Sequence, residues 1–253
     1  MHPKILSALG LRTHFLMPGF SFVRQQKKNP ALESVFAAPE QTIFLDANFF
    51  IPPDRSVMGT KPIPFLKFCE IWLDPIFDVF PNLAIHESVY RELVTDMVRD
   101  YVDSRQKEKP PRLRVYTDAE LSEVEMALMQ AYISKLALYS QYIPERDNAK
   151  DRGEVRSLSF MAVKKFLYFA ANDTLPMNLI RKADALRTGL DEMELLEMYD
   201  VIYYLYCTGR YSTEGLRLLY KYEYYLTKQE KKTNPSWGDF IAKMNIIYGK
   251  NLG

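Results

Sequence analysis

The sequence has few of the residues that build disulfide frameworks and zinc sites. Its 253 residues include two cysteines, Cys69 and Cys207, and three histidines, His2, His14 and His86. Each cysteine lies in an apolar, helix-like stretch, and no CxxC spacing is present. Two buried, reduced thiols are therefore favoured over a disulfide or a zinc site. The histidines are too scattered along the chain to form a histidine-based metal site.

The chain also lacks a long apolar run and a large net charge. No apolar run is long enough to cross a bilayer, so we expect no membrane association and predict a cytoplasmic protein. The formal net charge is +1, which gives no general attraction to nucleic acid, so such binding would need a local patch. Residues 1–28 carry five basic side chains and no acidic one. Proline and glycine interrupt this segment, and we interpret it as a loosely attached extension rather than a targeting sequence.

Apolar residues, in contrast, are plentiful. They make up 47% of the chain, against 26% charged residues, which is typical of a soluble globular protein with a proper core. Apolar runs at 42–51, 82–85 and 167–171 read as strands, while 104–114 reads as a charged loop. Helices are expected over 64–77, from 86 towards 101, and over 117–142, 153–166, 191–206, 213–228 and 237–248.

Strands that alternate with helices predict an α/β fold: a mostly parallel central sheet flanked by helices, with a helical C-terminal extension. We divide the chain into an N-terminal extension (1–40), the α/β domain (41–210) and the helical extension (211–253). The tyrosine-rich stretch 220–225 is expected to pack against the protein rather than to stack on bases.

Four acidic residues have settings suited to one common site. Asp46 and Asp173 each close an apolar strand, and Glu92 and Glu154 lie on predicted helices. In parallel sheets the site lies at the carboxyl ends of the strands, where Asp46 and Asp173 are expected. Hard divalent cations prefer oxygen ligands, so four converging carboxylates indicate Mg²⁺ or Mn²⁺.

Each of these residues also has a purely structural interpretation. Asp46 could cap a turn, and Glu87 competes with Glu92 for the position facing the site. Asp151 and Glu154 have the Asp-x-x-Glu spacing of a helix capping box. Three polar neighbours are candidate supporting residues: Asn48 to orient Asp46 or cap a turn, Asn172 to shape a loop, and Thr174 to position a water or a phosphate.

The acidic motifs occur in the order found in PIN-domain metal-dependent ribonucleases, and the chain resembles that family over residues 42–206. The matching segments are Leu45-Asp46-Ala47-Asn48, Ile85-His86-Glu87 before Glu92-Leu93, Gly153-Glu154, and Asn172-Asp173. The resemblance implies a PIN-like fold, RNA as the substrate, and catalysis by Mg²⁺ or Mn²⁺ held by Asp46, Glu92, Glu154 and Asp173. The material before residue 42, the insertion at 95–145 and the helical tail depart from the family pattern.

Other functions stay open at this point. The larger nuclease superfamily shares this kind of site, so DNA is an alternative substrate for a structure-specific nuclease. A catalytically silent scaffold that binds nucleic acid or protein is a second alternative, although retention of all four acids argues against it. A toxin held by an inhibitory protein partner is a third, for which the chain is long. The sequence does not decide whether the protein forms a homo-oligomer.

Overall fold

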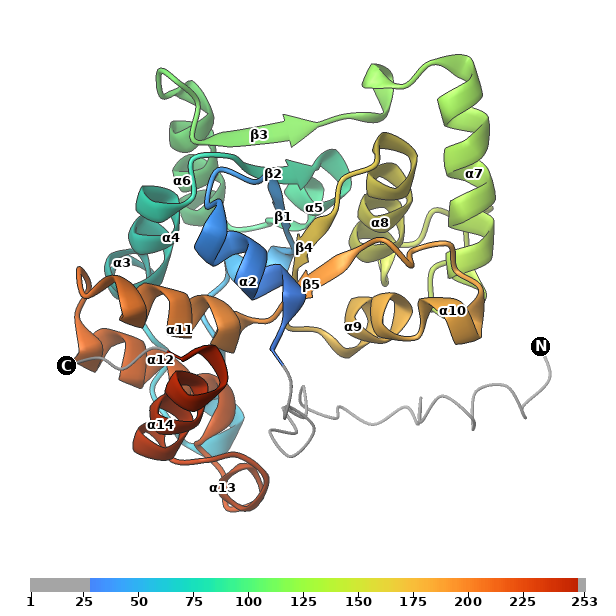
Figure 1. The fold of residues 1–253 in the computed structure, drawn as a ribbon. Coiled ribbons are helices and arrows are strands. Elements are labelled where there is room, and N and C mark those ends of the chain that lie inside the picture. Colours follow the sequence, from blue (N-terminus) through green and yellow to red (C-terminus); the bar gives the residue numbers. More distant parts are fainter. Residues whose placement is uncertain (1–27, 250–253) are drawn as a thin grey trace.

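A five-stranded, all-parallel sheet forms the centre of the computed structural model, which describes residues 28–249 (Figure 1). The strand order is β3-β2-β1-β4-β5. The strands are β1 (Ile43–Leu45), β2 (Leu83–His86), β3 (Leu113–Tyr116), β4 (Tyr168–Ala170) and β5 (Glu194–Leu196). The predicted α/β fold is confirmed, and the strand before Asp46 pairs with the strand before Asp173.

Both faces of the sheet are apolar because successive side chains of a strand point to opposite sides. In β1, Ile43 and Leu45 face one buried cluster and Phe44 faces the other. β4 repeats this alternation, with Phe169 on the side of Phe44. A sheet that is covered on both faces in this way is typical of parallel α/β folds.

The helices divide between these two clusters. Residues of α2 (Pro30–Ala37), α4 (Asp74–Val79), α5 (Glu87–Glu92), α6 (Asp96–Lys107), α11 (Met198–Thr208), α12 (Thr213–Tyr224) and α14 (Trp237–Tyr248) belong to the first. Residues of α7 (Glu123–Ala137), α8 (Arg152–Lys164), α9 (Thr174–Arg181) and α10 (Ala183–Leu186) belong to the second. Two further short helices are α3 (Phe65–Phe68) and α13 (Glu230–Thr233).

Two strands, β3 and β5, and four helices, α2, α9, α10 and α13, were not predicted. The expected loop 104–114 contains the end of α6 and the start of β3, and the expected helix 191–206 begins with β5. Both are edge strands. In β3 only Leu113 is buried, so the strand has a weak apolar signal. The helices α9 and α10 follow Asp173 in a stretch for which no element was predicted.

Several element boundaries also differ from the prediction. The first strand ends at Leu45, because Asp46 begins a 3-10 turn over Ala47–Phe49. The helix expected from residue 86 to 101 breaks between α5 and α6. Thr117 and Glu120 form a capping box at the start of the expected helix 117–142, but it begins only a short 3-10 turn. α7 starts at a second capping box, formed by Ser122 and Glu125, and ends at Ala137 rather than near 142.

The C-terminal helices pack into the same core as the sheet. Tyr220 and Tyr224 are both 1% exposed, which confirms that the tyrosine-rich stretch packs internally. At the other end of the chain, α2 buries Ala31, Leu32 and Val35 in this core. The basic segment 1–27 lies outside the described residues. Among residues 28–249, no helix is both long enough and apolar enough to cross a membrane.

Candidate metal centre

The candidate site lies where the connectivity of the sheet changes direction. From β1 the chain builds the sheet outward through β2 and β3, while β4 and β5 extend it on the other side. β1 and β4 are neighbours, with Leu45 paired to Ala170 at their carboxyl ends. At such a switch point the segments that leave the two strands diverge, and ligands of α/β proteins commonly bind there.

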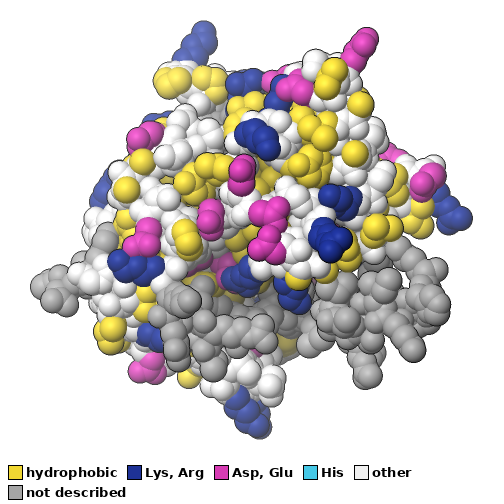
Figure 2. Space-filling view, turned by 45° about the vertical axis from the view of Figure 1, so that its right-hand side comes forward, with side chains coloured by type: hydrophobic (Ala, Val, Ile, Leu, Met, Phe, Trp, Pro, Cys, Tyr) yellow, Lys and Arg dark blue, Asp and Glu magenta, His cyan; other side chains and the backbone are white. Residues whose placement is uncertain are grey.

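Three of the four predicted acids come together at this edge. One carboxylate oxygen from each of Asp46, Glu154 and Asp173 lies within 4.8 Å of the other two. Asp46 follows β1 and is buried, Glu154 lies half-buried in the first turn of α8, and Asp173 is exposed immediately before α9. On one face of the molecule, acidic side chains gather near the middle, with Lys and Arg side chains around them (Figure 2).

Local hydrogen bonds fix the carboxylate of Asp46. Its Oδ1 accepts from the amide of Ala47 at 2.8 Å, and its Oδ2 accepts from Nδ2 of Asn48 at 2.9 Å. Its own amide donates to the carbonyl of Ala170 at 2.9 Å, which ties the end of β1 to β4. Asp46 therefore caps a 3-10 turn and also places a carboxylate oxygen close to Glu154 and Asp173. Asn48 orients Asp46, which was one of its two predicted roles.

Burial and the charges of neighbouring acids raise the pKa values of all three carboxylates. Burial, followed by the charges of Glu154 and Asp173, holds the pKa of Asp46 well above its usual range. Burial is also the main reason that the pKa of Glu154 rises to about 7. Although the residue is exposed as a whole, desolvation of its carboxylate raises the pKa of Asp173, and a hydrogen bond from Asn48 moderates the rise. Negative charges held this closely in a poorly solvated place favour a cation between them.

The residues present fit a hard divalent cation. The donor set consists of carboxylate oxygens, which Mg²⁺ and Mn²⁺ prefer. Oδ1 of Asn48 is a further oxygen at this site, and it is buried without a hydrogen-bond partner in the part of the chain that the structure describes. A buried amide oxygen normally has a partner, so Oδ1 of Asn48 is available as a further oxygen ligand.

Glu92 lies next to the three acids but outside their group. Its Oε1 accepts from the backbone amide of Gly153 at 2.8 Å. Its charge contributes to the raised pKa values of Asp46 and Glu154. Burial, the largest cause, also raises the pKa of Glu92 itself.

The competing residue Glu87 points to a different partner. Its Oε1 accepts from the amide of Asp118 at 3.0 Å, and its Oε2 pairs with Arg91. Of the two predicted rivals, Glu92 is therefore the one whose charge reaches the acidic group.

Asp151 does not form the predicted capping box with Glu154. The described structure gives Asp151 no capping hydrogen bond to α8. Instead, its Oδ2 accepts from the amide of Gln141 at 2.7 Å, and its Oδ1 pairs with Nζ of Lys150 at 3.1 Å. The capping interpretation is thus wrong, because these contacts hold the carboxylate away from the helix start. Glu154 is left to face the acidic group.

Asn172 differs from its predicted role as well. Its Nδ2 donates to Oε2 of Glu223 at 3.0 Å, and its Oδ1 accepts from the hydroxyl of Tyr224 at 2.7 Å. Asn172 therefore fastens the end of β4 to α12 instead of shaping a loop. Thr174, the first residue of α9, is exposed, and its role in positioning a water or a phosphate stays a prediction.

Sequence reasoning missed Glu223, a buried acid beside the site. Burial raises the pKa of Glu223 to about 7, and the charge of Asp173 adds to the rise. A signal was available in the helical periodicity. The buried stripe of α12 consists of residues 215, 216, 219, 220, 223 and 224, and an acid on the apolar stripe of an amphipathic helix is unusual.

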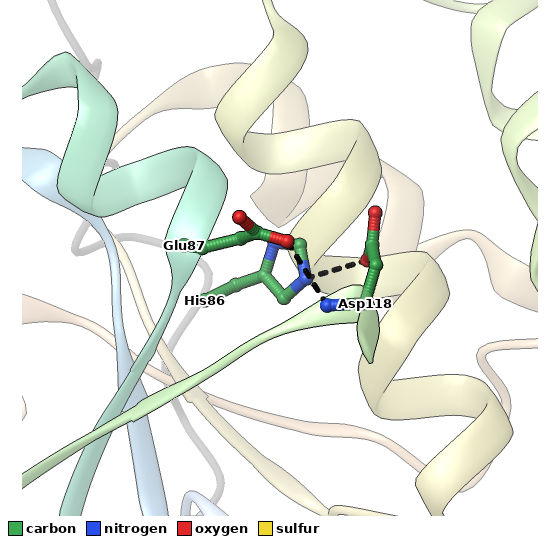
Figure 3. Close-up of side chains that lie close together, drawn as sticks. All are labelled: His86, Glu87 and Asp118. Atoms are coloured by element: carbon green, nitrogen blue, oxygen red, sulfur yellow. Dashed lines mark hydrogen bonds and ion pairs between the residues drawn. The ribbon is translucent and has the colours of Figure 1, made fainter. Parts of the chain in front are cut away.

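A second group, His86, Glu87 and Asp118, also has its ligand atoms close together (Figure 3). Nδ1 of His86 lies 2.7 Å from Oγ of Ser88, and Nε2 lies 3.0 Å from Oδ1 of Asp118. The other oxygen of Asp118 pairs with Arg156. Internal partners already engage both nitrogens of this buried histidine and both oxygens of Asp118, so this group is interpreted as a structural network.

Comparison with known proteins adds no identification. No family model matches the chain, and no curated protein or solved structure matches it.

Proposed function

We propose that this protein is a divalent-metal-dependent nuclease that hydrolyses RNA phosphodiester bonds. The observation that carries the proposal is the group of three carboxylate oxygens, from Asp46, Glu154 and Asp173, within 4.8 Å of one another. Its location at the switch point of a parallel sheet supports a functional role for the group, because structural acids rarely need such convergence.

In this proposal the ion is Mg²⁺ or Mn²⁺, which would supply an activated water and offset negative charge on the phosphate oxygens. The protein contributes rigid positioning and electrostatics. Asp46 is held by the amide of Ala47 and the side chain of Asn48, so its carboxylate needs little rearrangement. Asp173 is the exposed member of the group, which leaves that side of the site open to a substrate.

The choice of RNA rests on the resemblance of the acidic motifs to PIN-domain ribonucleases. The net charge of +1 gives no general attraction to a polyanion, so individual lysine and arginine side chains would have to hold the phosphate backbone. Lys150 is one candidate, because its positive charge is close enough to the site to lower the pKa of Asp173. Its ammonium lies 3.1 Å from Oδ1 of Asp151.

Cleavage of labelled single-stranded RNA by purified protein tests the proposal. We expect cleavage with Mn²⁺ or Mg²⁺ and none in EDTA. Asp46→Asn and Asp173→Asn should each lower the rate by more than about a hundredfold, since metal-ion stabilisation of the transition state is worth several kcal/mol. Glu192→Gln is the matched control, because Glu192 is exposed just before β5, at the opposite edge of the sheet.

The same assay includes single-stranded DNA and a flapped DNA duplex. Cleavage of DNA alone would replace RNA with DNA as the substrate. If no nucleic acid is cleaved and Mn²⁺ does not raise the melting temperature, the protein is a scaffold and the proposed activity is wrong.

A further inference from the structure

Glu92 makes a contact that separates it from the other three acids. The backbone amide of Gly153 donates to its Oε1 at 2.8 Å. Gly153 immediately precedes Glu154 and lies in the first turn of α8. Amides in this turn have no carbonyl partner within the helix, so a carboxylate from another element can bind one of them. The contact therefore joins the end of α5 to the helix that carries Glu154.

The space beside Gly153 is shaped for this carboxylate. A Cβ atom at residue 153 would lie 2.6 Å from both carboxylate oxygens of Glu92, which is closer than real Cβ contacts come. Any residue other than glycine would thus force the side chain of Glu92 to move. The other side of Gly153 is also held, since its carbonyl accepts from Oγ of Ser88 at 3.4 Å.

The geometry of the acidic group also separates Glu92 from the other three acids. One carboxylate oxygen from each of Asp46, Glu154 and Asp173 lies within 4.8 Å of the other two, and Glu92 does not belong to this group. Glu92 ends α5, and the next residue, Leu93, leaves the helix as its C-cap. The carboxylate of Glu92 therefore lies at the amide of Gly153, the residue immediately before Glu154.

From these contacts we infer that Glu92 is a positioning residue, which fixes the start of α8 through Gly153 and so places Glu154, rather than a fourth metal ligand. The inference rests on the proposed metal site. It assigns Glu92 the role of a hydrogen-bond acceptor, whereas a ligand would act through its charge and its direct contact with the ion. Removing an outer partner of a metal ligand typically weakens metal binding about 10–100-fold.

Glutamine separates the two roles, because it keeps the acceptor oxygen and removes the negative charge. We expect Glu92→Gln to bind Mn²⁺ within about tenfold of the unmodified protein, and Glu92→Ala to bind it about 10–100-fold more weakly. Glu154→Gln should bind Mn²⁺ more weakly than either variant. Titration with Mn²⁺ alone, followed by electron paramagnetic resonance of the free ion, measures all three affinities without an activity assay.

Gly153→Ala provides a second, independent variant. It leaves every acid in place, and alanine is tolerated in a helix, but its Cβ displaces the carboxylate of Glu92. It should therefore match Glu92→Ala in Mn²⁺ affinity. Hydrogen exchange of the Gly153 amide should stay slow in Glu92→Gln and accelerate in Glu92→Ala.

Two results would overturn the inference: Glu92→Gln that loses Mn²⁺ as severely as Glu154→Gln, or Gly153→Ala that binds Mn²⁺ like the unmodified protein. Failure of the unmodified protein to bind Mn²⁺ at all would be a different outcome. It would remove the metal site itself, and the positioning role with it.

Discussion

Replacing Glu154 with glutamine should stabilise the metal-free protein, and the gain should depend on pH. Glu154 packs against other carboxylates, and burial is the first cause of its raised pKa of about 7. Its ordinary pKa is 4.5. The raised value means that the folded protein holds this carboxylate at a cost whenever the group is ionised.

The sign and the size of the effect follow from proton linkage. Below about pH 4.5 the group is protonated in both the folded and the unfolded chain, so no cost arises. As the pH rises from 4.5 to 7, the unfolded chain loses the proton first, and folding stability falls. Above pH 7 the full cost applies, which for a shift from 4.5 to about 7 is at most about 3 kcal/mol.

Thermal melts in EDTA at pH 4.5 and pH 8 measure this difference. At pH 4.5, where linkage leaves a cost of less than about 0.5 kcal/mol, Glu154→Gln should melt within about 1–2 °C of the unmodified protein. At pH 8 it should melt up to about 6–12 °C higher, at 2–4 °C per kcal/mol for a chain of this size. Glu192→Gln controls for the loss of an exposed charge and should leave both melts unchanged. If Glu154→Gln is no more stable than the unmodified protein at pH 8, or is equally stabilised at both pH values, ionised Glu154 does not carry the expected cost.

Three other perturbations have defined outcomes. Asn172→Ala removes a donor to Glu223 and an acceptor for Tyr224, so the free energy of unfolding in urea should fall by about 1–3 kcal/mol. An unchanged urea midpoint would mean that these two hydrogen bonds do not stabilise the protein. Phe169→Ala removes a fully buried ring of β4 and should lower the free energy of unfolding by about 3–5 kcal/mol. Leu167→Ala, at a residue that is 41% exposed, should lower it by less than about 0.5 kcal/mol. Equal losses in the two variants would contradict a core on both faces of the sheet. Mn²⁺ at about 100 times its dissociation constant should stabilise the protein by about 2.7 kcal/mol, and Asp46→Asn should not respond to it.

The sequence was sufficient to predict the placement of Asp46 and Asp173. Both follow short apolar runs, and in a parallel sheet all such runs end at the same edge. The remaining step, that β1 and β4 are neighbours, follows from the connectivity of this fold class. Local pattern and a general rule of topology were enough for these two residues.

The role of Glu92 could not be read from local pattern. It depends on α5 ending at Glu92 and on the amide of Gly153 lying opposite, 61 residues further along the chain. Periodicity predicts which face of a helix is polar. It does not predict which unpaired backbone amide of another helix that face will contact. The capping spacing of Asp151 and Glu154 misled for the same reason, since the contact of Asp151 with Gln141 is tertiary.

Edge strands and C-terminal packing were also beyond the local signal. β3 pairs with one neighbour and buries only Leu113, so its alternation of apolar and polar residues is weak. Glu223 reaches the site only because α12 packs against the end of β4. The helical extension predicted from the sequence thus contributes contacts beside Asp173.

Anomalous diffraction from Mn²⁺-soaked crystals would locate the metal ion on the protein. We expect a Mn²⁺ peak among the carboxylates of Asp46, Glu154 and Asp173, with Glu92 still bound to the amide of Gly153. Ordered Mn²⁺ found only elsewhere on the protein, or no peak at a saturating concentration, would contradict it.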